Sequence, residues 1–282
     1  MVTPSDKTRA AFYLEEEFEV SERKACQVLE LNRNTKRRLQ RPLPAEVIVD
    51  KVIELSEAQP RWGYRKVYDR LKLDGVCIGR ERVRLIRKRE GLQVRKKQHK
   101  KRHPGRDCPL LSAQYPGHVW SYDFVMDSTV DGKRLKLLTV IDEFNKHAFP
   151  IECRRSMTSG DVVRVLRKLF AVYGQPEWIR SDNGSEFIAE AVQKVLGEKG
   201  IKTQFIEPGK PWQNGYNESF NGILRDDCLN KWQFLTIREA RMVLEDWVDE
   251  YNDYRPHGSL GGLTPNLFQE RWDQECGVKQ AA

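Results

Sequence analysis

The stretch H-V-W-S-Y-D-F-V-M-D (118–127) alternates side chains as a β-strand does, and Asp123 lies near its centre. Successive strand side chains point to opposite faces, so we expect Tyr122 and Phe124 on one face and Asp123 on the other. A second strand is predicted at R-L-K-L-L-T-V-I-D-E (134–143). A carboxylate that leaves the middle of a strand on the side away from two aromatic rings is a candidate site residue.

Two further acidic residues stand in polar motifs downstream. Asp182 lies in R-S-D-N-G-S-E-F (180–187), after a short apolar strand and before Asn-Gly, a strong turn signal. Glu218 lies 36 positions later in P-W-Q-N-G-Y-N-E-S-F-N-G (211–222), in a helix predicted to start near Asn214. A carboxylate at the carboxyl end of a strand is a common ligand in open α/β sheets.

Together Asp123, Asp182 and Glu218 give the order Asp, Asp, thirty-five residues, Glu. Mg²⁺ is a hard cation that proteins bind through a few carboxylates and substrate phosphate. Two such ions about 4 Å apart can hold the attacking and leaving oxygens of a phosphodiester exchange. Neighbouring carboxylates also raise one another's pKa, which a cation relieves. The pattern predicts catalysis and metal binding by these three residues, with two Mg²⁺ or Mn²⁺ ions and no organic cofactor.

The predicted Glu218 helix carries polar residues at spacings of four, three and four, which place them on one face. They are Asn214, Glu218, Asn221 and Arg225. We interpret this stripe as a DNA-facing surface, with plain solvent exposure as the alternative. Lys210, in the loop before the helix, is a further candidate for DNA contact, because loops beside active sites often supply contacts.

These motifs resemble the catalytic core of DDE transposases and retroviral-type integrases. More narrowly, they resemble the second-frame protein (OrfB) of IS3-family insertion sequences. The resemblance rests on the Asp–Glu gap, on Arg225 seven residues after Glu218, and on the tail Y-N-D-Y-R-P-H-G-S-L-G-G-L-T-P (251–265). It covers nearly the whole chain. It implies an α/β fold: a ribonuclease-H-like core, with a mixed five-stranded sheet and helices, preceded by all-α helix-turn-helix modules.

The resemblance also implies an activity and partners. It implies a DNA transposase that cuts element ends and joins them to target DNA, as a metal-dependent polynucleotidyl transferase working as a homo-oligomer on DNA. A frameshift fusion behind an upstream OrfA-type helix-turn-helix protein is a further expectation. Alternatives are an inactive or domesticated DNA-binding protein, a ribonuclease-H-type nuclease, and a long-terminal-repeat integrase. The last is disfavoured because His99 and His103 have no cysteine pair after them to complete a zinc site.

Charge is unevenly distributed along the chain. Residues 1–110 carry 28 Lys+Arg and 16 Asp+Glu, a net +12, whereas residues 111–282 carry 21 and 25, a net −4, and the sum is the +8 of the whole chain. This division favours DNA-binding modules joined to a metal-binding core. The six scattered cysteines predict neither disulfides nor a zinc knuckle. Without an apolar segment of membrane-span length or a signal peptide, we expect a cytoplasmic, nucleoid-associated bacterial protein with no membrane partner.

Five segments are predicted from these patterns: a helix-turn-helix-like segment (1–41), a second helical module (42–94), a basic linker (95–114), the catalytic core (115–230) and a C-terminal helical tail (231–282). Within the core and tail we expect a third strand at 146–153, helices at 158–174, 186–199 and 236–250, and short strands at 177–181 and 202–206. Asp142 and Glu186 are acidic residues near the predicted site that we do not assign as metal ligands. Arg255 and His257 are expected to dock the tail, and Arg255 could also reach DNA.

The two helical modules supply the remaining DNA-contact candidates. In the first, Ser21 is the expected N-cap of a helix with Val28 on its apolar stripe, and the basic end holds Lys36, Arg37 and Arg38. In the second, the helix at 80–92 should bury Val83, Leu85 and Ile86 and present Arg84 and Arg87. Lys96 and Lys97 of the linker should bind polyanions without reading sequence. Trp62, Tyr64 and Tyr68 are assigned to a core rather than to base stacking. Solvated basic faces are the alternative throughout.

Overall fold

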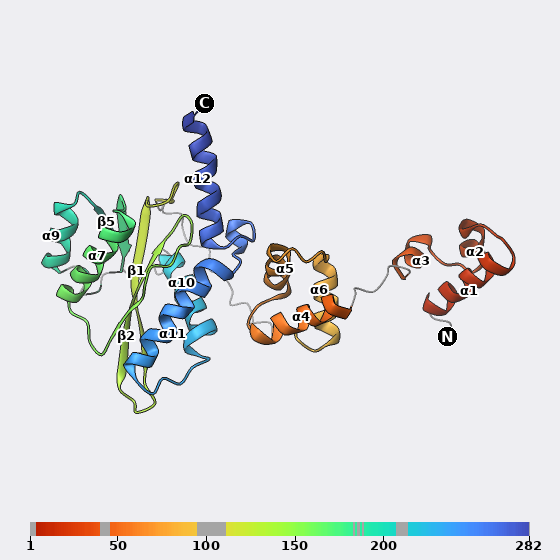
Figure 1. Cartoon of the computed structure of the whole chain (residues 1–282), viewed down its shortest axis with the longest axis horizontal. Helices are drawn as coiled ribbons and strands as arrows, with labels where there is room; N and C mark the ends of the chain where they lie inside the picture. The colour runs from red at the N-terminus through yellow and green to blue at the C-terminus, as the bar shows by residue number, and fades with distance from the viewer. Residues whose placement is uncertain are drawn as a thin grey trace. The chain divides into compact units, whose positions relative to one another are not determined.

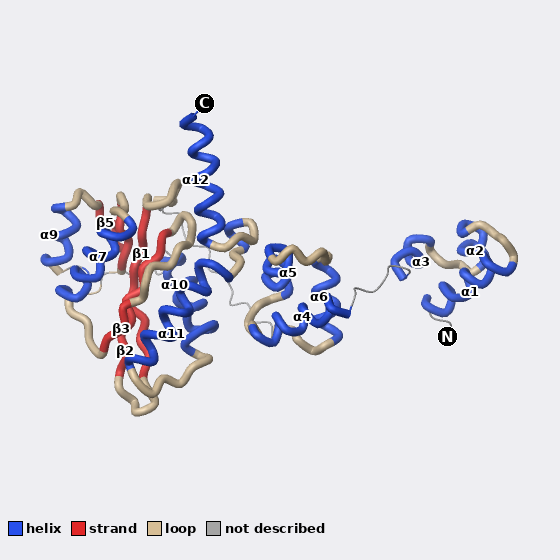
Figure 2. The backbone as a smooth tube through the Cα atoms, in the orientation of Figure 1, coloured by secondary structure: helices blue, strands red, loops and turns tan. Residues whose placement is uncertain are grey.

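The chain divides into two compact units, Met1–Lys51 and Val52–Ala282, and their helices and strands are drawn in Figures 1 and 2. The computed structural model describes residues 4–39, 46–94, 111–182, 184, 187, 189–206 and 214–281. Most of the predicted basic linker, including Lys96 and Lys97, therefore lies outside the described residues.

Among its described residues, the first unit contains α1 (Pro4–Glu17), α2 (Glu22–Val28), α3 (Arg33–Leu39) and the first residues of α4, which begins at Glu46. The Ser21 hydroxyl accepts a backbone N–H of the first turn of α2, so the predicted N-cap is confirmed. The small core of the unit consists of Ala11, Ala25, Cys26 and Leu31. Val28 was expected inside but is exposed, because Ala25 and Cys26 occupy the buried face of this short helix.

A second set of helices consists of α4 (Glu46–Ala58), α5 (Tyr64–Leu73) and α6 (Arg80–Arg89). Its buried apolar residues are Val52, Leu55, Trp62, Val67, Leu71, Val83 and Ile86. The assignment of Trp62 to the core is confirmed, since its side chain is 1% exposed. Leu85 was predicted to lie inward, and this is wrong. It is exposed because the buried face of α6 runs through Val83 and Ile86, one helical turn apart.

A mixed five-stranded sheet lies in the second unit, in the order β3-β2-β1-β4-β5. The strands are β1 (Val119–Ser128), β2 (Arg134–Asp142), β3 (Glu152–Arg154), β4 (Trp178–Ser181) and β5 (Lys202–Phe205). β2 pairs antiparallel with both β1 and β3, whereas β4 runs parallel to β1 and to β5. The predicted α/β fold with a mixed five-stranded sheet is confirmed.

The third strand is much shorter than predicted. Only Glu152–Arg154 pairs as a strand, and Ala148 makes an isolated bridge with Ile141. Two residues explain the break. Lys146 has a φ of +62°, which lies outside the strand region, and Pro150 has no N–H to donate to a ladder.

Helices cover both faces of the sheet (Figure 1). α7 (Ser159–Tyr173) and α9 (Glu190–Glu198) pack on one face, and α10 (Gly215–Leu224) and α11 (Ile237–Asp249) pack on the other. The first core contains Tyr122, Leu138, Val140, Val162, Leu166, Ile179 and Val192, with Phe124 packed against it. The second contains Val125, Leu137, Ile141, Phe220, Leu244 and Trp247. As predicted, Tyr122 and Phe124 share one face, and the alternate side chains of β1 turn toward α10.

The C-terminal segment continues with π-helical turns at Arg225–Leu229 and Glu250–Tyr254 and ends in α12 (Pro265–Ala281). Arg255 is buried and ion-paired with Asp227, so it joins the two π-helical turns. Its expected role in docking the tail is confirmed, and we do not propose it as a DNA contact. Within the described chain, no helix combines the length and the apolar character needed to cross a membrane.

Candidate active site

Asp123 leaves the middle of β1 toward α10 and is half-buried. Its carboxylate accepts the Phe124 N–H at 2.7 Å and the Asn221 side-chain N–H at 2.8 Å. The Thr139 hydroxyl lies 3.1 Å from both the Asp123 carbonyl and the Asn221 side-chain oxygen. Asn221 was predicted as a DNA contact because of its place in the polar stripe. The structure instead places it on Asp123, whose orientation it fixes.

Asp182 directly follows β4 and is exposed. Its carboxylate accepts the Gly184 backbone N–H at 2.9 Å, as in a tight turn. A Cβ added to Gly184 would come within 3.0 Å of that carboxylate and 3.2 Å of the Phe187 ring. Phe187 is buried between Tyr122 and Phe124, with ring centroids 4.4 and 4.6 Å away. The motif thus anchors the turn after Asp182 to the sheet.

Glu218 lies on the exposed face of α10, whose opposite face buries Phe220 and Leu224. Arg225 is also exposed, and its guanidinium donates to the Met126 carbonyl at 3.0 Å. The predicted polar stripe therefore divides: Glu218 and Arg225 remain at the surface, whereas Asn214 is buried. Asn214 is accordingly not proposed as a DNA contact.

Asp182 and Glu218 act electrostatically on Asp123. Burial raises the pKa of Asp123 to about 6, and the charges of Asp182 and Glu218 add to that effect. The β1–β4 ladder pairs Ser121 with Arg180, so its register leads Asp123 and Asp182 toward the same position. Across the described residues, however, no three His, Cys, Asp or Glu side chains are placed tightly enough to hold a metal ion. The arrangement is an open acidic site rather than a closed set of ligands.

A buried ion pair beside this site was missed by the sequence reading. Arg180 is 1% exposed and donates to both oxygens of Glu143, at 2.8 and 2.6 Å. It also donates to the Leu111 carbonyl at 2.7 Å and to the Gln204 side chain at 3.0 Å. Arg180 therefore joins four segments of the core two residues before Asp182. An arginine directly after two apolar residues in a short interior strand was the available signal.

Asp142, which was not assigned as a metal ligand, has a structural role. It is 3% exposed and accepts the backbone N–H groups of Gly117 and Phe144, at 2.6 and 2.8 Å. Burial raises its pKa, which those hydrogen bonds oppose. Glu186, the other such residue, lies outside the described residues, as does Lys210.

The basic candidates of the helical modules fall into two groups. Lys36 is buried in an ion pair with Glu15, and Arg87 is buried and donates to the Trp62 and Leu92 carbonyls. Neither is available to DNA, and we withdraw both as contacts. Arg37 is exposed and paired with Glu22, and Arg84 is paired with Glu81. The Arg38 side chain is not among those described.

The chain is similar to known domain families over most of its length. Residues 113–211 and 199–265 match two models described as integrase core domain, and residues 45–102 match an HTH-like domain. Asp123 and Asp182 fall within the first match and Glu218 within the second. The helices α4 to α6 fall within the third.

Proteins of bacterial insertion elements match most of this chain. The IS476 uncharacterized 39.2 kDa protein of Xanthomonas euvesicatoria is 35% identical over 268 residues, covering 95% of this chain and 78% of that protein. The IS407 uncharacterized 31.7 kDa protein of Burkholderia multivorans is 34% identical over 256 residues, covering 90% and 92%. The putative transposase InsK for IS150 of Escherichia coli is 26% identical over 226 residues, covering 76% and 80%.

Proposed function

This chain belongs to the IS3-type family of insertion-element transposases with an integrase core, and on that premise we propose that it cleaves and joins DNA strands at Asp123, Asp182 and Glu218. Water would first attack a phosphodiester at an element end and release a 3′-OH. That hydroxyl would then attack a phosphodiester of target DNA and displace its 3′ oxygen. Each step forms one phosphorus–oxygen bond and breaks one, so no nucleotide cofactor is consumed.

The placement of Asp182 and Glu218 within electrostatic reach of Asp123 supports this proposal. Asp123 is half-buried and responds to the charges of both other residues, while Asp182 and Glu218 are exposed where a DNA strand can reach them. Like charges held together without an opposite charge are unfavourable. Such a cluster is typical of a site that acquires its cation from solution or with its substrate.

The donor set matches a hard divalent cation, because all three side chains offer carboxylate oxygens. We propose Mg²⁺ or Mn²⁺, with two ions per site. When bound, such ions lower the pKa of the attacking oxygen and neutralise charge on the phosphate. Asn221 and Thr139 hold the Asp123 carboxylate in a fixed orientation. Asp182 is oriented by the turn at Gly184.

Exposed basic side chains would hold the DNA. Arg225 lies on the surface of the Glu218 helix segment, and Arg37 is exposed in the first unit. We propose both as phosphate contacts, together with Arg84, Lys96, Lys97 and Lys210. The proposal includes assembly of several copies on DNA, because two element ends and a target must meet in one complex. Fusion to an upstream helix-turn-helix protein stays a prediction.

The test is strand transfer by purified protein, with labelled duplexes from immediately outside both ends of its own gene as donor. Wild type should join donor to plasmid in Mg²⁺ or Mn²⁺. Glu218→Gln should bind the duplex normally but lose cleavage and joining about 10³-fold or more, as removal of one member of a catalytic unit does. Glu198→Gln, exposed on α9, is the matched control and should retain activity.

Other outcomes would favour the rival functions. Cleavage of any duplex without joining would indicate a ribonuclease-H-type nuclease. Binding without chemistry in both wild type and Glu198→Gln would indicate a DNA-binding protein. Joining by Glu218→Gln at the wild-type rate would remove Glu218 from the site.

A further inference from the structure

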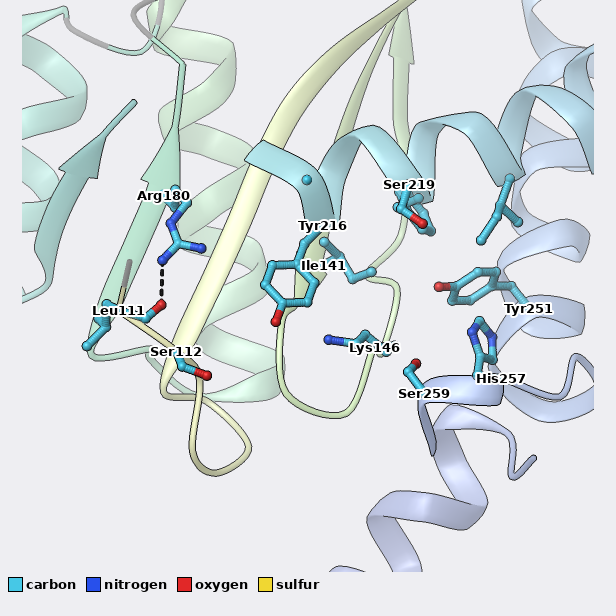
Figure 3. Close-up of a pocket in the computed structure, with 13 residues that line it drawn as sticks. Leu111, Ser112, Ile141, Lys146, Arg180, Tyr216, Ser219, Tyr251, His257 and Ser259 are labelled. Carbon is cyan, nitrogen blue, oxygen red and sulfur yellow. Dashed lines mark hydrogen bonds between the residues drawn. The ribbon is translucent and has the colours of Figure 1, made fainter. Parts of the chain in front are cut away.

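A hollow of about 450 Å³ opens beside the N-terminal half of α10 (Figure 3). Ser219 and Ile223 line it, and the same two residues line the recess that contains Glu218. The hollow therefore adjoins the candidate active site around the surface of one helix. Its size lies within the range of small-molecule sites, roughly 300–1,000 Å³.

Aromatic and apolar side chains form much of its wall. Tyr216 projects into the hollow from α10 (Figure 3), and Phe220 and Tyr251 line it as well. The rings of Tyr251 and His257 meet edge to face, with centroids 4.7 Å apart. Aromatic walls of this kind favour a flat partner, such as a nucleobase, whose faces are apolar and whose edges are polar.

Lys146 supplies a positive charge at the same place. Its ammonium lies 3.9 Å from the centroid of the Tyr216 ring and contacts the Glu143 carbonyl. Burial lowers the pKa of Lys146 to about 8, so it remains largely protonated at neutral pH. Arg180 also lines the hollow, but Glu143 and Leu111 already accept its hydrogen bonds.

His257 provides one ring nitrogen with no hydrogen-bond partner in the described structure. Its side chain is 8% exposed, and its Nε2 atom makes no hydrogen bond within the described structure. Buried polar atoms are normally hydrogen-bonded, so an unpaired ring nitrogen lining a hollow indicates a missing ligand or water. Burial, with the charges of Arg255 and Lys66, lowers the pKa of His257 to about 3. The ring is therefore neutral and can meet the edge of a base.

We propose that this hollow receives one unpaired nucleotide of the DNA held at the Glu218 site, with its phosphate toward Lys146 and the edge of its base toward His257. The inference rests on the proposed function, because it needs a DNA strand at Glu218. Taking a base out of a duplex costs free energy, because its pairing and stacking are lost. DNA that already has an unpaired nucleotide should accordingly bind more tightly than blunt DNA.

The test uses two duplexes of one sequence, blunt or with a two-nucleotide single-stranded end, each carrying 2-aminopurine at the end. Fluorescence, acrylamide quenching and anisotropy are measured in EDTA, so that no chemistry is needed. Wild type should shield the unpaired 2-aminopurine from acrylamide and bind the single-stranded end about tenfold more tightly than the blunt one, a ratio equivalent to the stacking of one base.

Two variants separate the hollow from the rest of the DNA surface. Ser259→Phe fills the hollow from an exposed position and should abolish both shielding and preference, whereas Ser156→Phe, exposed and outside it, should keep both. Lys146→Asn should weaken the preference, and asparagine tolerates the positive φ of this position. Equal shielding by Ser259→Phe and wild type, or no preference in wild type, would overturn the inference.

Strand transfer measured in parallel distinguishes the two proposals. Normal joining without shielding of the unpaired base would overturn the hollow as a nucleotide site and leave the transposase function standing. Shielding that Ser259→Phe abolishes, in a protein that joins no DNA, would support the hollow and count against the proposed function.

Discussion

Charged side chains are accommodated differently at two neighbouring sites, which lie two residues apart along β1 and at the end of β4. Where Ser121 of β1 pairs with Arg180 of β4, the arginine is buried and fully engaged with Glu143. Two residues further along each segment stand Asp123 and Asp182, the first half-buried and the second exposed, with Glu218 nearby on α10. The buried position balances its charges within the protein. The open position gathers negative charge.

The difference follows from the cost of desolvation. An ion removed from water needs a well-placed opposite charge and further hydrogen bonds, and Arg180 has both. Exposed carboxylates keep their water and tolerate repulsion until a cation or phosphate-bound metal arrives. The buried pair therefore fixes the end of β4, and the open carboxylates remain available for chemistry.

Removing one member of the buried pair is the most severe test of this contrast. Glu143→Gln leaves the Arg180 charge buried without its partner, which should lower the free energy of unfolding by about 3–5 kcal/mol. Urea unfolding followed by circular dichroism measures the change. The double variant Arg180→Met with Glu143→Leu should recover most of the loss, because apolar groups of similar size need no charge partner. A loss below about 1 kcal/mol in Glu143→Gln would mean that water reaches this pair.

The sequence predicted the arrangement of the sheet better than it predicted the partners of the charged residues. The strand pattern around Asp123 determined which residues face each core, because alternation leaves two choices per strand and aromatic residues at 122 and 124 decide between them. The Asp182 turn was predictable from Asn-Gly. The Glu218 helix was placed correctly, since Phe220 and Leu224 mark its buried face.

Sequence patterns could not identify which basic residues are available to contact DNA. Lys36 and Arg87 look like DNA contacts in a charged segment, yet each is buried and bonded to a partner that lies far away in the sequence or on another element. The same reason hides the pairing of Arg180 with Glu143, 37 positions apart in the chain. Long-range partners depend on packing, which a local spacing rule does not contain.

Asn221 tests the boundary between the two kinds of position, because it belongs to the exposed helix but bonds to the half-buried Asp123. A hydrogen bond to a charged group contributes about 1.5–3 kcal/mol. Asn221→Ala should therefore slow strand transfer about tenfold to a hundredfold at saturating DNA, with DNA binding in EDTA unchanged. Gel-based joining rates and anisotropy measure the two quantities separately.

The matched control is Asn230→Ala, an exposed residue just after the first π-helical turn, which should keep the wild-type rate. Weaker DNA binding by Asn221→Ala, with a normal rate once DNA saturates, would show that the amide contacts phosphate, as the sequence pattern suggested. It would also remove Asn221 as the residue that orients Asp123.

The smallest expected effect is the pH dependence of stability that His257 causes. It concerns a third case, a buried titratable group that stays neutral. Burial and the charges of Arg255 and Lys66 lower its pKa to about 3, and Lys146 acts in the same direction. In the unfolded chain its pKa returns to about 6.5. As the pH falls below that value, the unfolded state binds a proton that the folded state does not bind, so the free energy of unfolding falls with falling pH.

Between pH 7.5 and 5.5 this loss of stability should be about 1.4 kcal/mol, and His257→Asn should lack it. Urea unfolding of both proteins at the two pH values isolates the effect, because His147, whose pKa burial also lowers, contributes equally to each. Identical losses in the two proteins would mean that His257 is protonated in the folded protein. The buried interior beside α10 would then tolerate a charge that we expect it to exclude.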